Sequence, residues 1–219
     1  MQALIKKDLL TQQKIVYLSC LIWFIPLTNF FTDGMPFKHV LLMTFLAFSL
    51  VFSSNFNTKT TEERQAIFIN SLPVTRRQVV LAKYFTGLIW YGISAVFVTF
   101  YVLLFHLFAP FPSRMIYLEE YVISLSIMYI LLSIFYPLIY AIGYTSALFL
   151  TGAILVSVLM AFQIILNLAE NPRFPSVNDF LATLSQNQWM IAGILALVAI
   201  IITTISYQAS VKIYNKADL

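Results

Sequence analysis

Five long stretches of this sequence contain no charged residue. They cover residues 15–32, 39–58, 84–113, 121–169 and 180–211. A helix needs about 20 consecutive apolar residues to cross the hydrocarbon of a bilayer. Four of the stretches can therefore each hold one membrane span, and the longest, 121–169, can hold two. The expected transmembrane segments are 15–31, 37–54, 84–108, 119–141, 145–168 and 188–208.

The spans are expected to be helices. The chain is 60% hydrophobic and only 10% charged, whereas an ordinary soluble domain is about 25% charged. Inside lipid every backbone N–H and C=O must be satisfied within the protein, which leaves helices and closed barrels. Barrel strands alternate apolar and polar residues, and residues 191–198 (IAGILALV) do not alternate. We therefore expect an all-α integral membrane protein, with residues 1–219 forming one transmembrane domain.

The basic residues are divided unequally between the two sides of the membrane. With six spans, both termini lie on the same side. That side carries Lys6, Lys7, Lys14, Lys59, Arg64, Arg76, Arg77, Lys83, Lys212 and Lys216, and the other carries Lys38, Arg114 and Arg173. Cytoplasmic loops of membrane proteins are enriched in Lys and Arg. The bias predicts that both termini are cytoplasmic.

No charge marks the boundary between the fourth and fifth spans. Pro137 disfavours one continuous helix through this region, and Gly143 with the polar residues after it favours a chain reversal. The sequence predicts a tight cytoplasmic turn near 142–145.

Three further segments lie outside the expected spans. Residues 1–14 precede the first expected span, and residues 169–187 are expected to form an extracellular loop with helical structure. The cytoplasmic connection 55–83 is expected to form two short helices. Thr75 and Gln78 have the spacing of a capping box, so the second of these helices should run directly into the third span.

No nucleotide-binding motif is present. A P-loop needs glycines followed by Lys and Ser or Thr, so that backbone N–H groups surround the phosphates. Gly87 and Gly92 have the glycine spacing, but Ile93 stands where lysine is required. The chain itself is not expected to bind ATP.

The acidic and histidine residues do not form a recognisable catalytic or metal site. The pairs Glu62–Glu63 and Glu119–Glu120 lack the arginine that follows such a pair in intramembrane prenyl-protein proteases. His39 and His106 are isolated in the sequence, whereas a zinc site needs three or four converging ligands. We expect no enzymatic activity, no metal and no cofactor in this chain.

No Asp, Glu, Lys or Arg lies deep in any expected span. Ion-coupled carriers place such groups near the middle of the membrane. If the protein moves a substrate uphill, its energy is expected to come from another subunit.

Three tyrosines recur on one face of the fourth span. Tyr129, Tyr136 and Tyr140 are separated by intervals of seven and four residues, which place them on one side of a helix. That side is either a seam between helices or part of a wall that faces a substrate.

Two segments resemble those of ABC-2-type transporter permeases. Glu62–Glu63–Arg64–Gln65, followed by residues 70–84 (NSLPVTRRQVVLAKY), is similar to the loop between their second and third spans. The opening residues 4–9 (LIKKDL) are similar to their short cytoplasmic helix before the first span, which implies that residues 1–14 form such a helix. The resemblance implies the six-span ABC-2 (type V exporter-like) fold. Within the family, the chain looks closest to small permeases of Gram-positive bacteria that export phenol-soluble modulins or confer immunity to antimicrobial peptides.

The resemblance also implies a mechanism. A separate ATP-binding-cassette subunit, which binds ATP and Mg²⁺, would dock on the cytoplasmic loop and the N-terminal helix, and two permease chains would form the pathway between them in the bacterial plasma membrane. The substrate would be an amphipathic or antimicrobial-type peptide, and no nucleic acid would be involved. The residues expected to couple to the ATPase are Glu62, Glu63, Arg64, Lys6, Lys7 and Asp8. Those expected to contact either the partner or lipid headgroups are Arg76, Arg77 and Lys83.

Two other functions share this topology. A membrane scaffold that transports nothing would not need a structured loop coupled to an ATPase. An autonomous channel or carrier would conduct its substrate without ATP.

Overall fold

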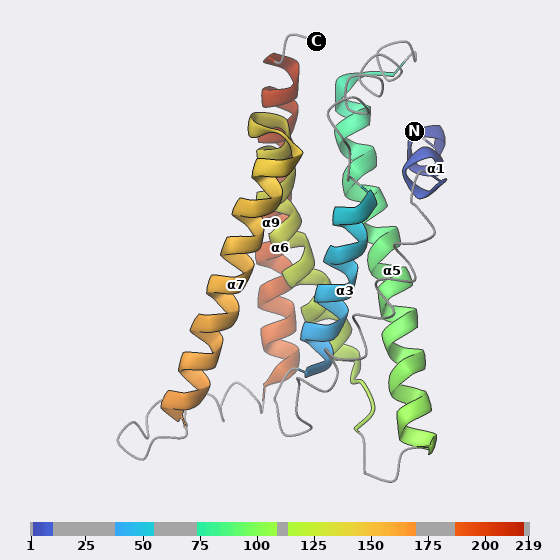
Figure 1. Ribbon diagram of the computed structural model, residues 1–219, viewed down its shortest axis with the longest axis vertical. Coiled ribbons are helices and arrows are strands. Elements are labelled where there is room, and N and C mark those ends of the chain that lie inside the picture. Colours follow the sequence, from blue (N-terminus) through green and yellow to red (C-terminus); the bar gives the residue numbers. More distant parts are fainter. Residues whose placement is uncertain (1, 11–37, 55–73, 109–113, 170–186, 217–219) are drawn as a thin grey trace.

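The described residues of the computed structural model are all helical apart from short connections (Figure 1). The structure describes residues 2–10, 38–54, 74–108, 114–169 and 187–216. Its helices are α1 (Gln2–Leu10), α3 (Lys38–Ser54), α5 (Arg76–Phe108), α6 (Leu118–Ile142), α7 (Tyr144–Ala169) and α9 (Gln188–Lys216).

Five of the six expected spans coincide with a helix, and the expected span 15–31 lies outside the described residues. Among the described helices, α5, α6 and α9 are long and apolar enough to cross a membrane. The helix α3 and residues Tyr144–Val158 of α7 are shorter apolar helices.

The helices α3, α6 and α9 run in one direction, and α5 and α7 run in the opposite direction (Figure 1). The helix α1 lies beside the first turns of α5, at the end of the molecule where α9 finishes. We call this the α1 end. Both described ends of the chain, α1 and the end of α9, lie there.

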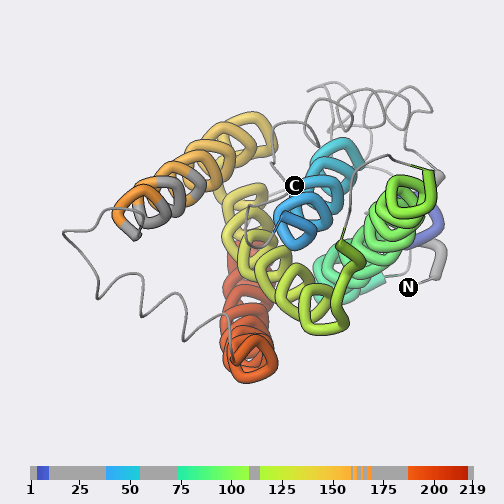
Figure 2. The backbone as a smooth tube through the Cα atoms, turned by 90° about the horizontal axis from the view of Figure 1, so that it is seen from below, coloured from blue at the N-terminus to red at the C-terminus, as the bar shows by residue number. Residues whose placement is uncertain are grey.

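The helix α6 lies in the middle of the assembly, between α3, α5, α7 and α9 (Figure 2). Its fully buried side chains Met128 and Phe135 pack with Met43 of α3 and Trp90 of α5 in one apolar core. Hydrogen bonds between helices also hold them together. For example, the hydroxyl of Ser94 donates to the carbonyl of Met43 over 2.9 Å.

The turn between α6 and α7 consists of a single residue. Gly143 has a φ of 81°, a conformation that residues with a Cβ rarely adopt. Its N–H donates to the carbonyl of Ile139 over 3.0 Å. The predicted turn near 142–145 is confirmed, and α6 continues through Pro137 to reach it.

The start of α5 confirms the predicted capping box. The N–H of Thr75 donates to Oε1 of Gln78 over 3.0 Å, and the N–H of Gln78 donates to Oγ1 of Thr75 over 3.3 Å. The last part of the connection 55–83 is therefore the beginning of α5 and continues into the third span, as predicted. Residues 55–73 and 170–186, which include most of both expected loops, lie outside the described residues.

Candidate functional site

The helix α1 is attached to α5 by a small apolar cluster. Leu4 is buried against Val79 and Ala82 of α5, and Ile5 and Val74 flank them. Val79 and Ala82 are three residues apart, so they face the same side of the helix. This contact positions the next turn of α1 over Lys83.

A buried carboxylate lies where α1 and α5 meet. Asp8 is 4% exposed, and its Oδ2 lies 2.9 Å from Nζ of Lys83. Its other oxygen, Oδ1, lies 3.8 Å from Nζ of Lys7. Burial and repulsion from Lys83 lower the pKa of Lys7 more than Asp8 raises it. Two cations thus share one carboxylate, and the better-placed cation is Lys83 of α5.

The backbone beside Lys83 is tied to α6 by two of the tyrosines identified from the sequence. The hydroxyl of Tyr136 donates to the carbonyl of Lys83 over 3.0 Å. The hydroxyl of Tyr129 donates to the carbonyl of the next residue, Tyr84, over 3.1 Å. One turn later, a Cβ on Gly87 would lie 2.8 Å from Cδ1 of Leu132. The absence of a side chain at Gly87 lets the two helices approach closely enough for these hydrogen bonds.

The same point of α5 is also tied to α9. The hydroxyl of Tyr84 lies 2.7 Å from Oγ of Ser206, and Ser206 donates to the carbonyl of Ser133 in α6 over 2.6 Å. We define the junction as the residues that meet here. It comprises Asp8, Lys83, Tyr84, Tyr129, Tyr136 and Ser206.

Arg76 joins the first turn of α5 to the last turn of α9. Its Nη1 donates to the carbonyls of Tyr214 and Asn215, each over 2.9 Å, and its guanidinium lies 5.7 Å from the centre of the Tyr214 ring. The last carbonyls of a helix have no partner within the helix and favour a cation. The centre of the Tyr140 ring lies 5.0 Å from that of the Tyr214 ring. Arg76 and Tyr140 therefore both hold the end of α9.

The residues predicted to couple to a partner fall into three groups. Asp8, Lys83 and, more weakly, Lys7 come together at the α1 end, with Arg76 close by along α5. Lys6 and Arg77 are exposed at the same end. The residues Glu62, Glu63 and Arg64 lie outside the described part of the chain. Lining of a pathway by Tyr129, Tyr136 and Tyr140 remains a prediction, although within this chain all three contact neighbouring helices.

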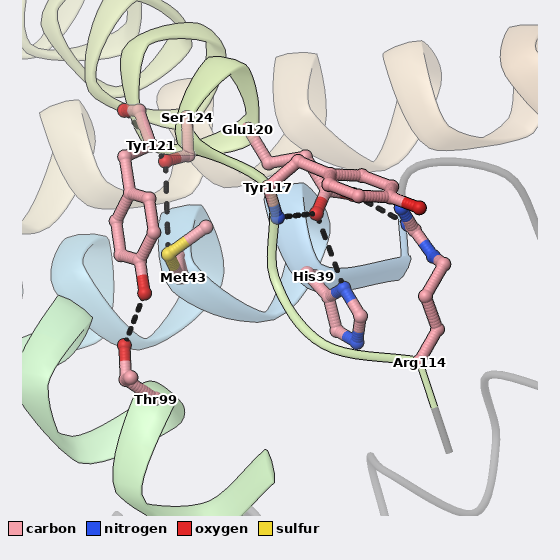
Figure 3. Close-up of polar contacts among 8 residues, drawn as sticks. All are labelled: His39, Met43, Thr99, Arg114, Tyr117, Glu120, Tyr121 and Ser124. Atoms are coloured by element: carbon pink, nitrogen blue, oxygen red, sulfur yellow. Dashed lines mark hydrogen bonds and ion pairs between the residues drawn. The ribbon is translucent and has the colours of Figure 1, made fainter. Parts of the chain in front are cut away.

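A second polar cluster, at the opposite end of the molecule, is centred on Glu120 (Figure 3). Glu120 is 2% exposed. Its Oε1 accepts a bond from Arg114 over 2.6 Å, and its Oε2 accepts one from the N–H of Tyr117 over 2.9 Å and lies 3.3 Å from Nδ1 of His39. Glu120 thus caps α6 and also ties it to the start of α3.

Sequence reasoning treated His39 and Glu120 separately and missed this pair. The available signal was their position, because each lies at the beginning of an expected span on the same side of the membrane. Each was therefore at the right depth to contact the other.

Comparison with known proteins agrees with the resemblance described above. Residues 3–215 match the family described as ABC-2 family transporter protein. No curated protein and no solved structure matches the chain. Because the match extends over nearly all of the sequence, the chain belongs to the ABC-2 family, whose members are membrane components of transporters that work with an ATP-binding-cassette subunit and are not themselves catalytic.

Proposed function

We propose that this chain is the permease subunit of an ATP-binding-cassette exporter that moves amphipathic or antimicrobial-type peptides out of a bacterial cell. A separate subunit binds ATP and Mg²⁺ and hydrolyses the nucleotide. Two permease chains pair in the plasma membrane, with both termini in the cytoplasm. The relation to exporters of phenol-soluble modulins is part of this proposal.

The observation that carries the proposal is the junction. A partner that moves α1 displaces Asp8, and the 2.9 Å ion pair passes that displacement to Lys83 of α5. Because Tyr136 and Tyr129 bind the backbone of α5 at this point, α6 follows. A small movement outside the membrane is thereby delivered to several helices at once, through contacts that have definite geometry.

The charge distribution supports the proposed orientation. Exposed basic side chains at the α1 end include Lys6, Arg77, Lys212 and Lys216. The described residues at the opposite end include Lys38 and Arg114. An excess of basic residues is typical of the cytoplasmic side, which is also where an ATP-binding subunit would dock.

The proposal is tested by co-expressing the full chain with the ATP-binding protein encoded beside it and measuring assembly and ATPase activity. Three variants are compared with wild type. They are Asp8→Asn, the triple change Glu62→Ala/Glu63→Ala/Arg64→Ala, and Lys216→Ala as a control at the same end of the molecule.

We expect a stable complex with wild type and with Lys216→Ala. The triple change should weaken assembly, because it removes predicted contacts with the partner. Asp8→Asn should preserve assembly but uncouple the ATPase rate from added peptide, because it removes the ion pair between α1 and Lys83 of α5. A wild-type chain that binds no such ATPase would overturn the proposal. Peptide or ion flux across vesicles that contain this chain alone would also overturn the proposal and would favour an autonomous channel or carrier.

A further inference from the structure

A cavity of about 450 Å³ opens between α5, α6 and α9. In Figure 2, α5 and α9 lie on either side of α6, and residues of all three helices line the cavity. Its lining includes Leu81 of α5, Leu125 and Tyr129 of α6, and Ala196 and Tyr207 of α9. Two junction residues, Tyr84 and Tyr129, form part of its wall.

The serine and threonine hydroxyl groups that line this cavity already have partners within the protein. Ser126 donates to the carbonyl of Val122 over 2.7 Å, and Thr204 donates to the carbonyl of Ile200 over 2.8 Å. An extended polypeptide in such a place would leave its own N–H and C=O groups unpaired, which is costly inside lipid. The surface therefore suits an occupant without polar groups.

The cavity is elongated. It extends along α9 from Ala196 to Tyr207, about 16 Å at the rise of an α-helix. A volume of about 450 Å³ over that length has room for one extended alkyl chain. The length also matches one leaflet of the hydrocarbon, about 15 Å.

A cation lies beyond one end of the cavity. Arg77 precedes Leu81 by four residues, so it lies on the same face of α5, one turn closer to the α1 end. Its side chain is exposed. An anionic headgroup attached to a chain in the cavity would meet this guanidinium, which binds phosphate oxygens in pairs.

We propose that the cavity between α5, α6 and α9 binds one acyl chain of an anionic phospholipid, whose phosphate contacts Arg77. Because Arg77 lies at the α1 end, the orientation proposed above places this phosphate on the cytoplasmic side, but occupation of the cavity does not depend on what the chain transports. Because the acyl chain contacts Tyr84 and Tyr129, the bound lipid supports the junction from the membrane side.

The site is tested with full-length protein in phosphatidylcholine vesicles that contain phosphatidylglycerol with a photoreactive group in its acyl chain. Labelled residues are mapped by mass spectrometry. We expect labelling to concentrate on the walls of the cavity rather than on exposed apolar residues elsewhere, such as Phe149 of α7. Photoreactive phosphatidylcholine serves as the uncharged probe.

Two pairs of variants separate the acyl site from the headgroup site. Ala196→Phe fills the cavity and should reduce its labelling severalfold, whereas Leu197→Phe adds the same ring to the adjacent exposed position and should not. Arg77→Gln should reduce the preference for phosphatidylglycerol over phosphatidylcholine about fivefold, the usual contribution of one basic side chain at an anionic surface. Lys212→Gln, at the same end but turned away from the cavity on α9, should leave that preference unchanged.

Uniform labelling of all exposed apolar residues would overturn the proposal in favour of non-specific boundary lipid. Labelling of the cavity that Ala196→Phe does not reduce would do the same. Cross-links between two copies through the cavity would assign it to an interface instead. If Ala196→Phe fails to fold, the Arg77→Gln comparison still decides, because an unchanged lipid preference would contradict the headgroup contact. None of these outcomes depends on ATPase coupling.

Discussion

Removing Asp8 should loosen α1 much more than removing Lys83, although the two residues form one ion pair. In Asp8→Ala, Lys7 and Lys83 are left close together in a half-buried site without the carboxylate that they share. In Lys83→Ala, Asp8 keeps Lys7 as a partner at 3.8 Å. The carbonyl of residue 83 also remains, so its hydrogen bond from Tyr136 survives.

The size of the difference follows from burial. Breaking a fully buried pair typically costs about 3–5 kcal/mol, but the side chains of Lys7 and Lys83 are 18% and 20% exposed and are partly screened. We therefore expect Asp8→Ala to weaken the docking of α1 by about 2 kcal/mol and Lys83→Ala by about 1 kcal/mol or less.

The assay measures how often α1 lifts from α5. Ala82 is buried under α1, so Ala82→Cys places a thiol that reacts only when α1 opens. The single native cysteine is removed with Cys20→Ser. At about 1.4 kcal/mol per tenfold change, Asp8→Ala should raise the labelling rate about 30-fold and Lys83→Ala about fivefold or less.

The order of the two effects is the critical result. If Lys83→Ala accelerates labelling as much as Asp8→Ala, then Lys7 does not compensate and the shared carboxylate is not the centre of the site. If neither substitution changes the rate, α1 is held by its apolar contacts alone, and an ion pair would not be the link between α1 and α5.

Three further results are expected. Because the pKa of Lys7 is lowered from 10.5, undocked α1 binds more protons than docked α1 between the lowered and the ordinary pKa, so docking strengthens as pH rises through that window. Lys7→Met removes the charge that disfavours docking, so it should slow the thiol labelling of the Ala82→Cys variant at neutral pH. Faster labelling would contradict this sign. Gly92→Ala should raise the thermal unfolding temperature in detergent, because a Cβ there meets nothing within 4 Å and alanine restricts the unfolded chain. Gly87→Ala should lower the unfolding temperature, because overpacking against α6 costs about 1–3 kcal/mol. Equal shifts of the two variants would refute the close approach of α5 and α6. Glu120→Gln should destabilise the protein by about 2 kcal/mol, because the buried carboxylate accepts hydrogen bonds from charged and backbone donors. Arg114→Gln should cost under about 1 kcal/mol, because the Arg114 side chain is 42% exposed and its charge is screened by solvent. Thermal unfolding in low and high salt measures both losses, and a larger loss from Arg114→Gln would contradict this order.

The positions of the helices were largely predictable because hydropathy measures the property that decides them. The expected spans 37–54, 119–141 and 145–168 agree with α3, α6 and α7 to within one residue at each end. The helices α5 and α9 are longer than their expected spans, beginning at Arg76 and ending at Lys216 respectively. Hydropathy identifies only the part of a helix that contacts lipid, so these polar extensions could not be read from it.

The partners within the site were less predictable. Asp8, Lys83 and Tyr136 were each selected from the sequence, but their contacts join residues on three separate helices. His39 and Glu120 are 81 residues apart, and a lone histidine carries no local pattern that names its partner. The capping box of Thr75 and Gln78 was predictable because both of its members lie in one turn.

The single-residue link at Gly143 has a consequence for how the protein enters the membrane. The helix α7 begins immediately after this glycine, and the hydroxyl of Tyr144 donates to the carbonyl of Phe52 in α3 over 3.0 Å. A link of one residue cannot span any distance between separated segments. Once both are folded, α6 and α7 therefore cannot occupy separate places in the membrane, and they join the helices that precede them as one hairpin.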